Sequence, residues 1–388
     1  SSSNNLKRIF RLKKRTEEKE KSDKEVFSIS KVRIRNMAFL MENFRKDQSK
    51  FGEGGINWFD MEVRDINISG RKLRMKGPVM SGLCDSLSFR EKSGYVCRRI
   101  SGEATVGNGK TSITSLHIAD NWSDIYFPEF VMTYENTASW SEFVTAVRMT
   151  GHIDRSHVSL GTIGYFAPSL AGKTMEADLD GDVDGFVSRL SLKGLNIATP
   201  GLSGKISGTV NGLPDVEDMI ISADIRNLGF TSAGLEDFIC GWAPSTNLGM
   251  SRFCEGENLT FNGKLNGRLN DFRVAGNIGG GIGSASTDLN IRNLIRKDRP
   301  MDIGGRIITD DLNIRKVLGS GPVDECSLRT SATARIGKDT TELSIDSLFV
   351  DRLNMNDYDY SGIVAAGKFS GNTFDGRIVC SDPNLNFL

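Results

Sequence analysis

The stretch Leu259–Ile278, with the sequence LTFNGKLNGRLNDFRVAGNI, decides the fold that we expect for this chain. From Leu259 to Leu269 apolar residues or glycines occupy every second position, and polar residues stand between them. After Asn270-Asp271 the parity changes and the alternation continues. Successive side chains of a strand point to opposite faces of a sheet, so the pattern predicts two strands with one apolar and one polar face. Asn and Asp tolerate turn conformations, which predicts a tight hairpin between the two strands.

The same alternation recurs from Val26 to the end of the 388-residue chain, without the strict period of a propeller or a leucine-rich repeat. Glycine is abundant (42 residues) and proline is scarce (9), which is typical of many strands with glycine at their bends. The expected fold class is therefore mostly β: an extended, curled antiparallel sheet that forms an open groove, with one or two short helices.

The chain divides into a short charged segment and one long repetitive unit. Residues 1–25 carry a dense run of charges of both signs and predict a flexible linker. Residues 26–388 predict the elongated groove. A helical insertion at about 139–168 begins with the capping box SWSE and joins the sub-segments 26–135 and 170–388.

Charge and hydropathy exclude several classes of partner. Basic and acidic residues balance at 49 each, so no net field attracts the chain to nucleic acid, and we predict no nucleic-acid partner. No apolar run approaches the roughly 20 residues that a membrane-spanning helix needs. Because the chain starts at Ser1 without a methionine, we take it as an excised piece and expect any anchor outside it.

No motif predicts a catalytic or metal site, and we expect neither enzyme activity nor a cofactor. The acidic residues Asp180, Asp182 and Asp184 resemble the start of a calcium loop, but Ser191 stands where a bidentate glutamate is required. The phosphate-loop-like GNGKT at 107–111 precedes an expected strand rather than a helix. The three histidines accompany no serine-nucleophile motif, and the carboxylates are too scattered to indicate a glycosidase pair.

The six cysteines show no CxxC spacing, which argues against zinc and against a redox motif. Cys240 and Cys254 bracket a short loop and could form a disulfide in an oxidising compartment. Buried free thiols are the alternative, and the sequence leaves this choice open.

Two architectures use the apolar row differently. In one, two sheets pack their apolar faces together around a filled core. In the other, one long sheet curls into a trough whose apolar face stays open. The apolar content of 38% is low for a packed core, and glycines in the inward row leave space for a ligand, so we expect the trough. These glycines are Gly263, Gly267, Gly276, Gly362 and Gly376.

A long, featureless apolar channel suits a lipid acyl chain. Each buried methylene contributes about 0.8 kcal/mol, so an acyl chain gains on the order of 10 kcal/mol relative to water. The side chains predicted to line the lipid-binding groove are Phe261, Leu265, Leu269, Phe272, Val274, Ile278, Leu289, Ile291, Ile303, Ile307, Leu343, Ile345 and Ile378.

Four segments of the chain resemble the TamB family of AsmA-like proteins: 202–216 (LSGKISGTVNGLPDV), 259–273 (LTFNGKLNGRLNDFR), 158–171 (VSLGTIGYFAPSLA) and 374–388 (FDGRIVCSDPNLNFL). The resemblance implies a β-groove across the periplasm of a diderm bacterium, anchored in the inner membrane at its amino end. It also implies an Omp85-type outer-membrane partner, phospholipid transport to the outer membrane, and support of outer-membrane protein assembly. The family's anchoring helix and partner-binding terminal domain are absent from this sequence, so both contacts are expected through regions outside it.

Two further functions stay open. A non-enzymatic structural or adhesive β-solenoid at the cell surface would have a filled core and carry no lipid. A β-helical glycan enzyme would need carboxylates clustered in a groove.

Overall fold

The computed structural model describes residues 25–43, 45, 55–215, 218–243, 248–294, 298–337, 341–371 and 373–387. The predicted linker therefore lies outside the described residues except for Glu25, which already belongs to the first strand. The strands are β1 (Glu25–Glu42), β2 (Asp60–Lys76), β3 (Val79–Glu91), β4 (Val96–Gly107), β5 (Lys110–Ala119), β6 (Asp124–Thr133), β7 (Arg148–Ser159), β8 (Glu176–Phe186), β9 (Arg189–Thr199), β10 (Leu202–Asn211), β11 (Ile220–Phe230), β12 (Leu259–Arg268), β13 (Asp271–Gly280), β14 (Gly283–Arg292), β15 (Met301–Asn313), β16 (Val323–Ile336), β17 (Thr341–Met355), β18 (Tyr358–Tyr360), β19 (Ile363–Ser370), β20 (Thr373–Asp382) and β21 (Leu385–Phe387). The α-helices are α2 (Phe143–Ala146), α3 (Leu160–Phe166), α4 (Ser232–Trp242) and α5 (Ile314–Leu318), and the 3-10 helices are η1 (Thr137–Glu142), η2 (Pro168–Leu170) and η3 (Met250–Arg252).

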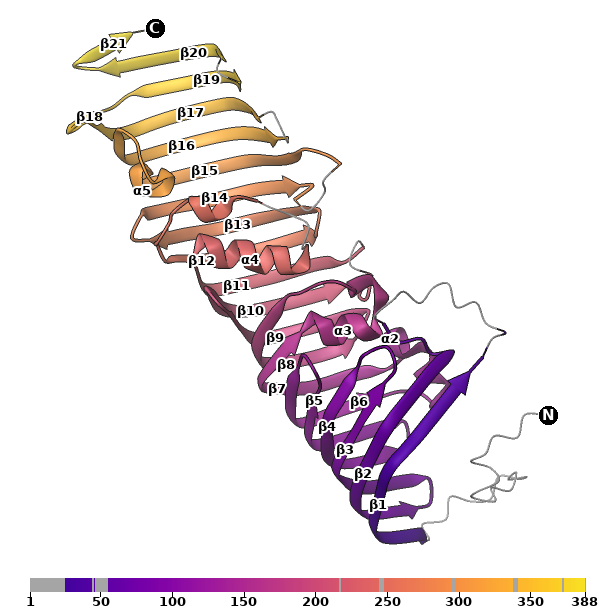
Figure 1. Cartoon of the computed structure of the whole chain (residues 1–388). Coiled ribbons are helices and arrows are strands. Elements are labelled where there is room, and N and C mark those ends of the chain that lie inside the picture. Colours follow the sequence, from indigo (N-terminus) through magenta and orange to yellow (C-terminus); the bar gives the residue numbers. More distant parts are fainter. Residues whose placement is uncertain are drawn as a thin grey trace.

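All of these strands belong to one antiparallel sheet of 21 strands. Each strand pairs with the next one in the chain, except that β19 pairs with β17 beside the short β18. Figure 1 shows a long, curled ramp of strands, with β1 at its lower end and β20 and β21 at its upper end. The sheet is not closed, and the predicted mostly-β fold with an open, curled antiparallel sheet is confirmed.

The curled sheet has two long edges, which we name by the strand ends that form them. Rim A holds the β3–β4, β5–β6, β9–β10 and β13–β14 turns, and α3, α4 and α5 are inserted between strands on this side. Rim B holds the β4–β5, β8–β9, β10–β11 and β12–β13 turns, together with η1 and α2. A single strand therefore crosses the whole trough from one rim to the other.

The sequence predicts a helical insertion at about 139–168, and this prediction is wrong for the central residues. These residues form β7, which pairs with β6 and β8. Its first helix is shorter than expected: η1 is followed by a single turn, α2. Asn136 rather than Ser139 caps it, since the Asn136 side chain accepts a hydrogen bond from the Ala138 backbone at 2.8 Å. The second expected helix, Leu160–Phe166, is present as α3.

A column of β-bulges bends the strands on the rim A side. Among the residues that adopt φ values between 40° and 60° and stand as extra residues against the neighbouring strand, five share a further contact: Asn36, Arg155, Gly194, Asn227 and Asp311. The backbone N–H of each donates to a side-chain oxygen on the next strand, at 2.8–3.4 Å, and the acceptors are Asn67, Asp180, Ser207, Asn262 and Ser327. A bulge bends and twists its strand, so this repeated device contributes to the curl of the sheet.

Removing one of these acceptors is expected to weaken the sheet slightly. Asn262→Ala leaves the Asn227 N–H with water as its only replacement partner, which should lower the free energy of unfolding by about 0.5–1 kcal/mol. Asn277→Ala, at the residue opposite Asn262 on β13, is the matched control and should change stability by less. Urea denaturation followed by circular dichroism measures both, and an equal loss in the two variants would contradict the role of the bulge.

The polar face carries ion pairs between neighbouring strands. Arg273 contacts Asp288 at 2.6 Å in a two-pronged pair, and its hydrogen bond lowers the pKa of that carboxyl. The same arrangement recurs for Arg71–Asp85, Arg148–Asp184 and Arg329–Asp351. Exposed pairs contribute little stability each, but burying this face against another layer would desolvate all of them.

The acidic run that resembles a calcium loop belongs to this face, on β8. Asp184 pairs with Arg148, Asp182 contacts His152 at 2.8 Å, and Asp180 accepts a hydrogen bond from Asn196. Alternate residues of one strand thus point to the same side, and each carboxylate has a protein partner. None of the six cysteines takes part in a disulfide, so Cys240 and Cys254 are not bonded to each other.

Candidate functional site

The apolar row of the sequence becomes a continuous apolar surface in the sheet. Phe261 lies opposite Ile278, and Leu265 lies opposite Val274, which in turn lies opposite Leu289. Phe272 lies opposite Ile291 on the next strand. Paired residues in an antiparallel sheet share a face, so side chains from β12, β13 and β14 form one surface.

The same face continues to the upper end of the sheet. Ile303 on β15 lies opposite Ile291 on β14. Ile307 lies on β15 as well, four residues after Ile303 and on the same face. On β16, Ala334 and Ala332 continue this face, and they lie opposite Leu343 and Ile345 on β17. Through Ala365 on β19 the face reaches Ile378 on β20, which lies opposite Ala365. All of the predicted lining residues except Leu269 therefore lie on one face.

Leu269 is not on this face, because the hairpin turn comes one residue earlier than the sequence suggests. Arg268 pairs with Asp271, so Leu269 and Asn270 are the two turn residues. The Leu269 side chain packs at rim B against a cluster around Leu170 and Met219. A two-residue turn needs its residues outside the ladder, and the local alternation of the sequence continues through it without a break.

Much of the apolar face is only half-buried in the part of the chain that the structure describes. On the upper strands Ile336, Phe369 and Ile378 are 37%, 41% and 38% exposed. At the lower end of the sheet, β1 exposes several large apolar side chains, including Phe27 and Phe39. A second layer of protein would bury such side chains almost completely, so the exposed values indicate an open surface at both ends.

Of the glycines expected in the inward row, Gly263, Gly276 and Gly376 leave no free space, contrary to the expectation from sequence. A Cβ at Gly263 would lie 2.5 Å from Cζ of Phe261, and one at Gly276 would lie 2.8 Å from Cε2 of the same ring. The Phe374 ring likewise lies 2.8 Å from a Cβ built at Gly367 or Gly376. Phenylalanine rings of the chain lie over these glycines, so their surface is flat and aromatic rather than hollow.

The centre of the trough is covered, whereas the sequence predicts an open groove along the whole chain. Leu235 and Phe238 of α4 pack on a cluster that contains Phe230, Leu259 and Phe261, all of them buried. Phe261 is only 6% exposed, so this predicted lining residue lies beneath the helix rather than in an open channel. The sequence signal was present: Thr231 is an N-cap residue, and Leu235, Phe238 and Trp242 follow at helical spacing.

Both rims are joined above this centre. The N-terminal turn of α4 meets the β9–β10 turn at Gly201 on rim A, where Thr231 N donates to Gly201 O at 2.9 Å. At the other end of the helix, Trp242 packs on the rim B cluster with Leu170 and Met219. A hydrogen bond from Ser169 of η2 to the Pro214 carbonyl adds a second link to rim B. The helical segments thus span the trough between β7 and β12.

A buried polar network fixes the start of α3 to rim A. Asp120 is fully buried, and its carboxylate accepts hydrogen bonds from the backbone of Trp122 and Ser123 at 2.8 and 2.7 Å. The Thr162 hydroxyl of α3 donates to the same carboxylate at 2.9 and 3.0 Å. Because Asp120 sits in the turn between β5 and β6, this network ties the helix to the sheet edge.

A second buried contact ties the end of α3 to the β3–β4 turn. The Tyr165 hydroxyl donates to Glu91 at 2.6 Å, and the Tyr165 ring stacks on Tyr95 with centroids 4.8 Å apart. Burial opposes ionisation of Glu91, but hydrogen bonds from Ser93 and Tyr165 outweigh it and lower the pKa of this carboxyl. The pKa of Tyr165 is raised, first by its own burial and then by its hydrogen bond to Glu91.

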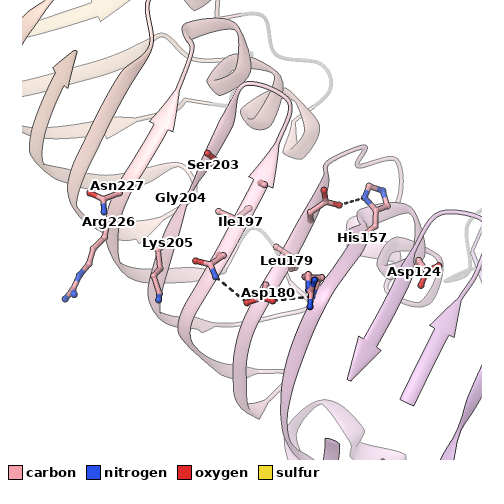
Figure 2. A pocket seen from close by; sticks show the side chains of 14 residues that line it. Asp124, His157, Leu179, Asp180, Ile197, Ser203, Gly204, Lys205, Arg226 and Asn227 are labelled. Carbon is pink, nitrogen blue, oxygen red and sulfur yellow. Dashed lines mark hydrogen bonds and ion pairs between the residues drawn. The ribbon is translucent and has the colours of Figure 1, made fainter. Parts of the chain in front are cut away.

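The polar face holds a separate cavity of about 820 Å³ beside the bulges at Arg155 and Asn227. Figure 2 shows Lys205 and Arg226 along one side of it, and His157 paired with Asp178 at 3.0 Å on the other. Charges of both signs line the cavity, and it opens widely to solvent. Its lining combines Leu179 and Ile197 with charged side chains, which does not suit an acyl chain.

Two negative findings apply to the described part of the chain. It contains no group of three or more histidine, cysteine or acidic side chains placed to hold a metal ion. None of its helices is long and apolar enough to cross a membrane. The apolar trough is therefore the feature that distinguishes this molecule, and we take it as the candidate site.

Comparison with known proteins adds no relative: no family model, no curated protein and no solved structure matches the chain.

Proposed function

We propose that this chain is a lipid-conduit segment of a TamB-like periplasmic protein. In this proposal the trough carries phospholipid acyl chains between the inner and outer membranes and so supports outer-membrane protein assembly. The observation that carries the proposal is the apolar face that runs in register from β12 to β20 and stays half-exposed at Ile378 and Phe369. Contacts with the inner membrane and with an Omp85-type partner would lie outside this chain.

The physical chemistry of the trough suits such a cargo. A methylene that leaves water gains about 0.8 kcal/mol, so an acyl chain is held by its length rather than by any single contact. Neighbouring strands present similar apolar side chains. An acyl chain that moves by one strand therefore exchanges one apolar environment for another. With a strand spacing of about 4.8 Å, some twenty strands give roughly 100 Å of surface along which a chain slides at little cost.

A structural or adhesive β-solenoid is the second candidate, and one observation favours it. Beneath α4 the trough is filled by the chain's own side chains, with Leu259 and Phe261 both 6% exposed. A solenoid would have such a filled core along its whole length. The half-exposed face above α4, at Ile336, Phe369 and Ile378, favours the conduit instead.

Lipid extraction separates the two candidates. We expect an organic extract of the purified protein to contain phospholipid in a fixed molar ratio to the chain, as judged by mass spectrometry. After lipid removal, the protein should bind a fluorescent fatty acid, because the half-exposed apolar face is then free. Protein that yields no lipid and binds no fatty acid would rule out the conduit and leave the solenoid.

A further inference from the structure

We propose that α4 is a displaceable cover that competes with lipid for the centre of the trough. Lipid then passes from the strands before α4 to the strands after it only when α4 leaves the sheet. This inference rests on the proposed function and deepens it. In the closed state, Leu235 and Phe238 occupy the place that an acyl chain would fill. The movement of α4 therefore controls the passage of lipid along the trough.

The first support is the position of the apolar side chains of α4. Leu235 and Phe238 pack on the same surface to which Phe261, Val274 and Ile278 belong, and these three are predicted lining residues. An acyl chain that followed the apolar face from β13 to β11 would have to occupy the space of these two side chains. Helix and ligand therefore exclude each other at this place.

The second support is that the cover reaches both rims. A phospholipid whose acyl chains lie in an open trough keeps its headgroup in the water at the mouth. Here the mouth is crossed by α4, which is about 16 Å long and extends from Gly201 at rim A to the Trp242 cluster at rim B. Figure 1 shows α4 lying over the strands around β11 and β12. A headgroup cannot pass this point while both ends of the helix are seated.

The third support is that the packing of α4 on the sheet buries few of its side chains. Only Ser232, Gly234 and Gly241 are buried in the helix, and its large apolar side chains stay half-exposed. At its carboxyl end the Gly241 carbonyl accepts hydrogen bonds from Thr174 and Met175 at 2.9 and 3.2 Å, and such backbone contacts can be replaced by water. A helix seated in this way can exchange with a ligand that buries the same apolar surface.

The α4 helix also carries its own following turn. The Glu236 carboxylate accepts hydrogen bonds from the backbone of Leu248, Gly249 and Ser251 at 2.7–3.0 Å. These contacts join the helix to η3 instead of joining it to the sheet. Helix and turn can therefore move together without leaving the Glu236 carboxylate unpaired.

Hydrogen exchange on the intact chain tests the displacement directly, with oleate as the probe. Saturating oleate should raise the exchange rate of the amides in 235–242 at least about fivefold, because these helical hydrogen bonds then open more often. Amides of β13 should become slower over the same titration. If oleate binds and the exchange of α4 stays unchanged or slows, the proposal is overturned.

A pair of phenylalanine variants tests the competition. Phe238→Ala removes a side chain from the seat and should increase the apparent affinity for oleate roughly fivefold to tenfold, since the closed state that competes with ligand is less populated. Phe253→Ala is the matched control, because Phe253 is 43% exposed in the segment after η3 and lies outside the cluster under α4. Unchanged or weaker binding by Phe238→Ala would overturn the proposal.

The two levels of inference fail differently. Wild-type protein that binds no oleate contradicts the proposed function and, with it, this inference. Wild-type protein that binds oleate while α4 stays closed contradicts only the cover. Circular dichroism melting of both phenylalanine variants checks that each remains folded, and the exchange experiment on the wild type does not depend on either of them.

Discussion

Replacing Asp120 by alanine is expected to lower the free energy of unfolding by about 3 kcal/mol. The Asp120 side chain is fully buried and accepts three hydrogen bonds, from Trp122, Ser123 and Thr162. Its removal leaves the backbone N–H groups of Trp122 and Ser123 without a partner in a site that water reaches poorly, while the Thr162 hydroxyl keeps only its contact with the Ser123 hydroxyl at 2.7 Å. Each buried unsatisfied group costs about 1–3 kcal/mol, and part of that sum is recovered by local rearrangement.

The measurement is urea denaturation followed by tryptophan fluorescence, since Trp122 lies in the affected turn, beside the rings of Tyr95 and Tyr165. Asp124→Ala is the matched control: its side chain is 60% exposed, and it pairs with His117 at 2.6 Å on the surface. An exposed pair of this kind contributes about 1 kcal/mol or less. Equal destabilisation by the two substitutions would show that the buried network does not hold α3 to rim A.

The second large effect concerns the proposed lipid transport. Ile378→Arg places a charge on the apolar face where that face is open, and it should lower lipid binding and transfer at least about tenfold. A cation facing acyl chains costs roughly 2–4 kcal/mol near the middle of a bilayer and less toward its surface, and an affinity falls tenfold for each 1.4 kcal/mol. Because Ile378 is already 38% exposed, the sheet should fold with the arginine in place.

Ile308→Arg is the control for this substitution. Ile308 has nearly the same exposure, 40%, but its register partners Ser286 and Arg329 place it on the polar face of the sheet. Transfer of a fluorescent phospholipid between donor and acceptor vesicles should therefore be lost in Ile378→Arg and kept in Ile308→Arg. If both variants transfer lipid equally well, the apolar face is not the path.

The strands and their two faces could be predicted from the sequence for a local reason. In a stretch such as 259–268 the alternation of side chains follows from strand geometry alone, without knowledge of any partner strand. The prediction of Ile278, Val274 and Phe272 as one row holds for the same reason, since consecutive antiparallel strands joined by tight turns bring like faces together.

The exact place of a turn was less predictable. Leu269 continues the apolar alternation, which predicts a place in the groove, yet it is a turn residue at rim B. Either of two adjacent registers satisfies the local pattern there, and the choice between them depends on the pairing of Arg268 with Asp271 and on the apolar cluster that receives Leu269. Such contacts join residues far apart in the chain, so local pattern alone does not decide them.

By itself, the sequence determined that this chain forms many short antiparallel strands with one apolar and one polar face, because that property resides in each strand separately. Only the tertiary structure decided where the apolar face is open and where it is covered. Phe261 and Ile378 carry the same signal in the sequence, yet one lies beneath α4 and the other is exposed near the upper end of the sheet. The difference arises because the curl of the sheet brings the two rims close enough for one helix to contact both, and no periodicity within a strand encodes that distance.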